Sequence, residues 1–232
     1  MLDDLGLEDL DDQGRKGRLE WLPDLGQPFV DLIDDERILP YLLAFVDDYV
    51  RLDHSYGIQM MDGSPGLGLH GEPDNRAPNC AWYHVRNGVI SAGLTVVSYA
   101  LTDVPADAGG FVCVPGSHKA NFSSPYLDQA ATAVREHLAH AELRAGDAVI
   151  FTEALTHGSL DWAGPSVRRA LFYKYAPGHA SWLDYRWAER DLERLTPRQR
   201  QVVAPPGVFD GVTAQARQPI ALADQEHRPH RG

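Results

Sequence analysis

The sequence contains little cysteine and no long apolar run. Cys80 and Cys113 are the 2 cysteines of its 232 residues, too few for a disulfide framework, so we expect both to be buried or half-buried free thiols. No apolar stretch approaches the roughly 20 residues that cross a bilayer. The acidic N-terminus also has no apolar segment typical of a signal peptide. These absences predict a protein of a reducing cytoplasm that does not act in a membrane.

Basic residues are also scarce. Lysine and arginine total 21 against 33 aspartates and glutamates, which gives a net charge of -12. Sequence-independent binding of nucleic acid needs a basic footprint, so nucleic acid is excluded as an expected partner. The same charge disfavours a substrate that carries several phosphates. A small organic molecule is the partner that remains.

The composition and its variation along the chain indicate one globular domain with less compact terminal segments. Hydrophobic residues make up 44% of the chain and charged residues 23%, which are ordinary values for a folded protein. We expect an acidic N-terminal arm over residues 1–27, a compact domain over 28–204 and a C-terminal tail or flap over 205–232. The chain shows no internal repeat.

Short β-branched and aromatic runs separated by Gly, Pro and Asp turns predict the strands. Apolar residues at helical spacing, with a capping Thr-Pro pair for the last helix, predict the helices. Short strands with helices gathered before and after them indicate a mainly β fold, a jelly roll with flanking α-helices. The expected strands are 54–61, 91–101, 111–114, 148–152 and 167–176, and the expected helices are 36–50, 125–138, 179–195 and one that begins after Thr196.

Two histidines and an acid are candidate metal ligands. His70 and Glu72 lie two residues apart, so in an extended segment both side chains point to the same side and can reach one ion. His157 follows the apolar segment 148–151 and precedes a glycine, which is typical of a side chain presented at the mouth of a barrel. Each motif alone is also explained by a surface pair or a structural histidine. Together, two histidines and one carboxylate make the facial triad of non-haem iron(II) oxygenases.

Arg168 adds a possible anion site. It lies eleven residues after His157 and begins an otherwise apolar strand. A buried guanidinium needs an anionic partner, and its planar fork suits a carboxylate. Arg169 should point to the opposite face, so only one of the two can face inward. Arg168 can therefore pair with the distal carboxylate of a 2-oxo acid chelated at the metal.

Several motifs then occur in the order of a known family. Leu-Thr-Asp ends at Asp103, Gly109-Gly110 follows, and Pro-Gly-Ser-His-Lys ends at Lys119, before His157-Gly-Ser and Arg168. In these motifs, over roughly residues 31–177, the chain resembles the phytanoyl-CoA dioxygenase family of 2-oxoglutarate oxygenases.

The resemblance implies a fold, cofactors and roles. It implies a double-stranded β-helix (a cupin-like jelly roll) that uses iron(II), 2-oxoglutarate and dioxygen. His70 and His157 would bind the metal, Arg168 would hold the distal carboxylate of 2-oxoglutarate, and Ser159 would add a hydrogen bond to it. His118, in the Pro-Gly-Ser-His motif, would be structural.

The chain departs from the family pattern at the carboxylate. The family usually has Asp two residues after the first histidine, whereas this chain has Glu72. Three alternatives stay open. Glu72 is the ligand, or it turns away and leaves a place for chloride as in the related halogenases, or another acid substitutes. Glu153, four residues before His157 and expected on the same strand, is the candidate substitute.

The expected activity is hydroxylation of a small metabolite or natural-product intermediate, with release of succinate and carbon dioxide. An acyl-CoA substrate would favour a cluster of basic residues, and none is obvious outside Arg168-Arg169. Substrate contacts are expected from Trp82, Tyr83 and His84 on a lid, and from Glu153 if it does not bind the metal. Two other classes remain as alternatives: a metal-dependent cupin enzyme without 2-oxoglutarate, and a non-catalytic binding protein on the same scaffold.

Overall fold

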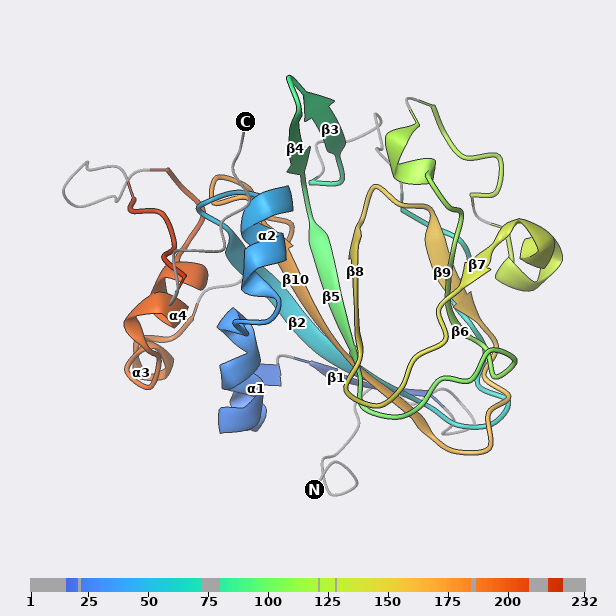
Figure 1. Cartoon of the computed structure of the whole chain (residues 1–232). Helices are drawn as coiled ribbons and strands as arrows, with labels where there is room; N and C mark the ends of the chain where they lie inside the picture. The colour runs from blue at the N-terminus through green and yellow to red at the C-terminus, as the bar shows by residue number, and fades with distance from the viewer. Residues whose placement is uncertain are drawn as a thin grey trace.

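Two antiparallel sheets form the centre of the molecule, and helices cover the outer face of the larger sheet (Figure 1). The structure is a computed structural model that describes residues 16–20, 22–71, 80–120, 122–127, 129–184, 187–208 and 217–222. The mainly β jelly roll with flanking helices is confirmed.

The larger sheet has five strands in the order β1-β2-β10-β5-β8, and the smaller sheet has the order β7-β6-β9. A hairpin, β3–β4, extends beyond the larger sheet (Figure 1). The strand bounds are β1 Lys16–Glu20, β2 Arg51–Met60, β3 Tyr83–Arg86, β4 Val89–Ala92, β5 Thr95–Ala100, β6 Gly110–Cys113, β7 Ala139–His140, β8 Ala148–Thr152, β9 His157–Leu160 and β10 Arg168–Ala176.

The helices are short. The α-helices are α1 Gln27–Asp31, α2 Leu39–Phe45, α3 Glu189–Leu192 and α4 Pro197–Val202, and the 3-10 helices are η1 Leu22–Leu25, η2 Leu32–Asp34, η3 Ser117–Lys119 and η4 Ala131–His137. The predicted start of the last helix is confirmed, because Thr196 and Gln199 form a reciprocal capping box at the first turn of α4.

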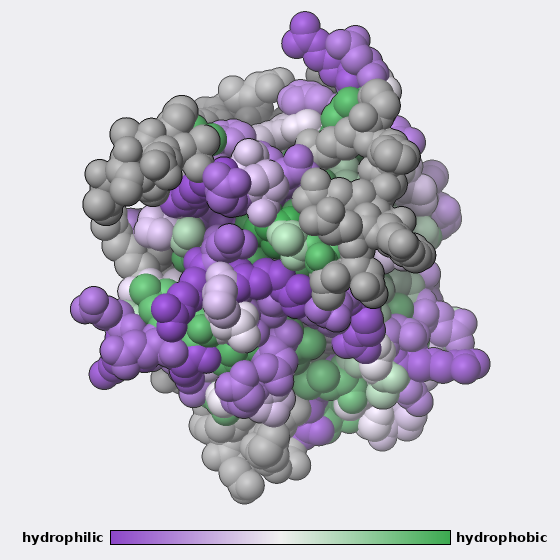
Figure 2. All heavy atoms as spheres, turned by 60° about the vertical axis from the view of Figure 1, so that its left-hand side comes forward, coloured by the Kyte–Doolittle hydropathy of each residue, from purple (hydrophilic) through white to green (hydrophobic). Residues whose placement is uncertain are grey.

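Strand β10 shows how the larger sheet separates its two faces. Leu171, Tyr173 and Tyr175 pack with residues of the helices in the main core. The alternate positions Arg168, Phe172 and Lys174 line a cavity on the other face. On the helix-bearing side, the described surface shows small apolar patches bordered by hydrophilic side chains (Figure 2).

Three sequence expectations differ from the structure. The helix expected over 179–195 is wrong for most of its length, since among the residues of this range that the structure describes only Glu189–Leu192 is helical. The helix expected over 125–138 is reduced to the 3-10 helix η4. The strand expected over 91–101 is interrupted at Gly93, where a Cβ atom would lie 1.7 Å from the carbonyl oxygen of Cys80. Contacts between segments that are distant in sequence override the local preference for helix or strand. The sequence pattern does not show these contacts.

The boundaries expected for the arm and tail stay predictions, but described parts of both segments contact the domain. Strand β1, within 1–27, pairs with β2 along its length. Ile220, within 205–232, is buried in the main core, and its backbone N–H donates to the carbonyl oxygen of Asp48. Cys80 and Cys113 are free thiols, the first buried and the second half-buried, as expected.

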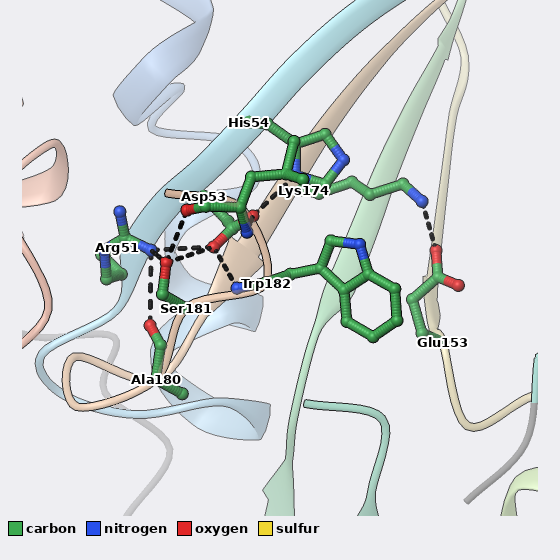
Figure 3. A network of polar contacts seen from close by, with 9 residues as sticks. Arg51, Asp53, His54, Glu153, Lys174, Ala180, Ser181 and Trp182 are labelled. Atoms are coloured by element: carbon green, nitrogen blue, oxygen red, sulfur yellow. Dashed lines mark hydrogen bonds and ion pairs between the residues drawn. The ribbon is translucent and has the colours of Figure 1, made fainter. Parts of the chain in front are cut away.

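A buried carboxylate holds the irregular segment 180–183 against β2. Asp53 pairs with Arg51 at 2.9 Å and with Nδ1 of His54 at 2.7 Å (Figure 3). It also accepts hydrogen bonds from the backbone N–H groups of Trp182 at 2.8 Å and Leu183 at 3.2 Å. Burial opposes the charged form, but these hydrogen bonds and charges outweigh it and lower the pKa of Asp53. The stabilising contribution of Asp53 is therefore present above the carboxyl's unfolded-state pKa and is lost as the pH falls through its folded-state pKa.

Replacing Asp53 should destabilise the fold strongly. In Asp53→Ala the guanidinium of Arg51, itself 2% exposed, loses its anionic partner. Breaking a buried pair in this way costs about 3–5 kcal/mol. Urea unfolding should show this loss, whereas Asp62→Ala, at an exposed turn, should stay within about 0.5 kcal/mol of the parent. Equal midpoints for the two variants would contradict a stabilising role for the network.

Candidate active site

The two histidines far apart in sequence are hydrogen-bonded neighbours. His70 and His157 form an antiparallel bridge in which each backbone N–H donates to the other's carbonyl oxygen at 2.8 Å. Their ring centroids lie 4.2 Å apart. His157 is the first residue of β9 and does not end β8, because residues 153–156 form a turn between these strands. The expectation that Glu153 and His157 share one strand is therefore wrong.

Backbone carbonyls orient both imidazoles. Nδ1 of His70 lies 2.9 Å from the carbonyl oxygen of Gly68, and Nδ1 of His157 lies 2.7 Å from that of Leu155. A carbonyl only accepts, so in the neutral rings both Nδ1 atoms carry the proton and both Nε2 atoms keep a lone pair. Burial lowers the pKa of His157 to about 4, so its ring is neutral at pH 7. Both Nε2 atoms can therefore act as metal ligands.

A glycine permits this close approach. Gly71 has φ 87°, and a Cβ atom there would lie 2.3 Å from the carbonyl oxygen of Leu155 and 3.0 Å from Nδ1 of His157. A side chain at position 71 would separate the segment that carries His70 from the turn before β9.

A glutamate completes a possible metal site. Ligand atoms of His70, Glu153 and His157 all lie within 4.8 Å of one another. Oε1 of Glu153 forms an ion pair with Nζ of Lys174 at 2.6 Å (Figure 3). Burial alone would raise the pKa of Glu153, but the charge and the hydrogen bond of Lys174 oppose this effect, and the pKa is lowered. The carboxylate is thus ionised and faces two imidazoles.

A cavity of about 370 Å³ opens beside this cluster. Its walls come from both sheets and combine aromatic rings with a few polar groups. Its lining residues are Tyr56, Ile58, Met60, Leu67, His70, Phe111, Phe151, Glu153, His157, Gly158, Ser159, Arg168, Phe172 and Lys174.

Arg168 points into the cavity with part of its hydrogen-bonding capacity unused. The residue is 4% exposed, and its terminal nitrogen Nη1 donates to the sulfur of Met60 at 3.1 Å. Its Nε is buried and has no hydrogen-bond partner among the described residues. Burial lowers the pKa of Arg168 to about 10, so it is still charged at pH 7. A buried, under-satisfied guanidinium suits a bound carboxylate.

The double glycine at the start of β6 makes room for this side chain. Gly110 has φ 88°, and a Cβ atom there would lie 3.3 Å from Nε of Arg168. Arg169 faces the other way and donates from Nε to Oε1 of Gln59 at 3.1 Å. The expectation that only one of the two arginines faces inward is confirmed.

The other expected site residues fall in different places. Ser159 lines the cavity, and its Oγ accepts a hydrogen bond from the backbone N–H of Leu67 at 2.8 Å, so its hydroxyl hydrogen is available to a ligand. Glu72 lies outside the described residues.

The expected lid residues do not line the cavity that holds the histidines. Trp82 packs beside Cys80. The rings of Tyr83 and His118 are in edge-to-face contact, with centroids 4.6 Å apart, and both residues line a separate cavity of about 250 Å³. His84 is exposed on β3. The β3–β4 hairpin diverges from the sheet and carries these residues away, so their contact with substrate stays a prediction.

Lys174, Tyr56 and Phe172 are cavity residues that the sequence analysis missed. The sequence could have indicated Lys174, because a lysine inside an otherwise apolar strand requires an anionic partner in the same way as Arg168 does. The Tyr56 and Phe172 rings are stacked, with centroids 4.9 Å apart. In the sequence, nothing distinguishes either residue from the aromatic residues that are common in strands.

Comparison with known proteins links the central part of the chain to a family. The family model for phytanoyl-CoA dioxygenase (PhyH) matches residues 76–170, which include Glu153, His157 and Arg168. The match covers less than half of the chain and indicates a phytanoyl-CoA dioxygenase-like segment within it. This similarity agrees with the non-haem iron(II)- and 2-oxoglutarate-dependent oxygenase that the sequence motifs predicted.

Solved structures agree with this PhyH-like fold. HygX from Streptomyces hygroscopicus, with nickel and 2-oxoglutarate bound, matches with a TM-score of 0.69 at 24% identity, over 81% of each chain. HygX with nickel, 2-oxoglutarate and hygromycin B bound gives a TM-score of 0.64 at 25% identity, over 79% of this chain and 80% of that one.

A more distant structure also shares the fold. SnoN, a non-haem α-ketoglutarate-dependent epimerase from nogalamycin biosynthesis, matches with a TM-score of 0.55 at 17% identity, over 98% of this chain and 82% of that one. No curated protein sequence matches the chain. No described helix of this PhyH-like protein has the length and apolarity needed to span a bilayer.

Proposed function

We propose that this PhyH-like protein hydroxylates a small polar organic molecule, with release of succinate and carbon dioxide. The observation that carries the proposal is the convergence of His70, Glu153 and His157 beside a cavity that also contains Arg168. With open positions left over, two histidines and a carboxylate suit iron(II).

Glu153 is the carboxylate that we assign to the metal. Its oxygen lies within 4.8 Å of ligand atoms of both histidines. Glu72, two residues after His70, is the alternative suggested by the sequence. A carboxylate facing the histidines also argues against the halogenase-like alternative, because it takes the position that chloride would need. The complete donor set argues against a decayed, non-catalytic scaffold.

The cavity offers separate places for co-substrate and substrate. Arg168 and Lys174 are six residues apart on the same face of β10, which corresponds to about 20 Å along the strand. Arg168, assisted by Ser159, would hold the distal carboxylate of 2-oxoglutarate. The other end, with Tyr56 and Phe172, is then left for the substrate.

Iron with 2-oxoglutarate and dioxygen supplies the oxidising chemistry when bound, while the protein's own residues fix geometry and exclude water. The carbonyls of Gly68 and Leu155 hold the two imidazoles in one orientation. Phe111, Phe151 and Phe172 give the cavity apolar walls that keep bulk water away from the metal site. The crystal structure of HygX with hygromycin B bound supports a small organic molecule as the kind of substrate.

Metal affinity of two glutamate variants tests the assignment. Calorimetry with Ni²⁺ should show Glu153→Gln binding at least about 30-fold more weakly than the parent, because the anionic ligand is lost. Glu72→Gln should stay within about threefold, as should Glu136→Gln, whose side chain is 71% exposed. The reverse order of the first two variants would move the assignment to Glu72. Parent-like binding by both would show that neither carboxylate holds the metal.

A further inference from the structure

Met60 lies directly against the guanidinium of Arg168 at one end of the cavity. The two residues are register partners across β2 and β10, and Nη1 of Arg168 donates to Sδ of Met60 at 3.1 Å. Both side chains line the cavity, and Met60 is 1% exposed. A thioether is a weak acceptor, so it touches the guanidinium without neutralising its charge. The contact therefore fixes the guanidinium in place and leaves its strong hydrogen bonds to a ligand.

The side chain of Met60 has little room to move. It packs in a cluster with three residues that are at most 3% exposed, namely Val104, Ala108 and Trp162. Protein interiors are close-packed, so a side chain enclosed in this way yields little when a neighbour presses on it. Met60 therefore limits how far the guanidinium of Arg168 can withdraw from the cavity.

The guanidinium lies at a defined distance from His157 along the smaller sheet. A Cβ atom at Gly110 would lie 3.3 Å from Nε of Arg168, and Gly110 is the register partner of Leu160. His157 and Leu160 are three residues apart on β9, which corresponds to about 10 Å along a strand. This separation suits a short diacid held by the metal at one end and by Arg168 at the other. The depth of the guanidinium then sets how long that diacid can be.

We propose that Met60 is a positioning residue for Arg168: by limiting how far the guanidinium withdraws, it makes the site select a five-carbon 2-oxo diacid over a longer one. This inference rests on the proposed binding of 2-oxoglutarate, and it holds whichever carboxylate completes the metal site. The probe is 2-oxoadipate, which has the same two ends and one more methylene. A pocket that fits one chain length discriminates against an extra methylene by about 10- to 200-fold.

Met60→Ala should change the preference between the two diacids. Calorimetry on the nickel-loaded parent should show 2-oxoglutarate binding at least about tenfold more tightly than 2-oxoadipate. In Met60→Ala the space left by the sulfur lets the guanidinium withdraw. The ratio of the two affinities should then fall at least about fivefold, with 2-oxoadipate binding more tightly than it does to the parent.

Two further variants serve as controls. Met60→Leu has a similar volume and should keep the ratio within about twofold of the parent's. Met61→Ala changes a half-buried methionine that does not line the cavity, and it should also leave the ratio unchanged. Where alanine at position 60 prevents folding, Met60→Val makes the same comparison, because valine suits a strand and ends short of the position of the sulfur.

A residue that only supports the fold would give a different result, because its loss would lower both affinities by the same factor. An unchanged ratio in Met60→Ala, or a ratio that falls as far in Met60→Leu as in Met60→Ala, would overturn the inference. So would a parent that binds both diacids equally well. If the nickel-loaded parent binds neither diacid, the proposed function itself fails, and this inference fails with it.

Discussion

His157→Ala should lose metal binding altogether within the range that calorimetry measures. His157 supplies one of the two imidazoles, and its backbone bridge to His70 places the other. Loss of a group that only supports a ligand costs 10–100-fold in affinity, so loss of the ligand itself should exceed about 100-fold. Succinate formation should disappear with it.

His137→Ala is the matched control, because this side chain is 48% exposed and does not line the cavity. It should bind Ni²⁺ like the parent. Retention of parent-like nickel affinity by His157→Ala would show that the metal, if one binds, is held elsewhere.

Arg168→Met should weaken 2-oxoglutarate while leaving the metal site intact. The buried guanidinium faces the cavity with an unused Nε, and a carboxylate is the partner it suits. Truncating one member of a buried charge pair costs about 2–5 kcal/mol, which corresponds to a loss of about 30-fold to several thousand-fold in affinity. Titration of the nickel-loaded protein with 2-oxoglutarate measures this loss.

Arg169→Met provides a control on the same strand with the opposite orientation. It should keep the 2-oxoglutarate affinity of the parent. Similar losses in the two variants would mean that arginine acts through overall charge and not through contact with the co-substrate. A loss of nickel affinity in Arg168→Met would mean that the variant disturbs the metal site itself.

Much of the site could be predicted because its residues follow local rules. Arg168 is an arginine in an apolar strand, and strand alternation correctly places it opposite Arg169. The strand 148–152 and the capped helix after Thr196 also depend on local pattern, and both are confirmed. The family motifs added the link between these segments.

The rest depends on contacts between distant segments. Glu153 approaches the histidines because a turn follows β8. The sequence pattern does not reveal this turn, so the prediction extended the strand as far as His157. The absence of the long helix expected after His179 follows from Asp53, which binds backbone N–H groups of the segment at Trp182 and Leu183. Lys174 acquires its significance only from Glu153, 21 residues away in sequence.

The most direct test of the central claim is an anaerobic titration of the parent protein with iron(II) and then 2-oxoglutarate. The claim is that His70, His157 and a carboxylate hold a metal to which the co-substrate binds. Addition of 2-oxoglutarate should then produce the weak visible charge-transfer band of a chelated 2-oxo acid, with one equivalent of iron bound. Iron binding without the band, or no iron binding at all, would contradict the account.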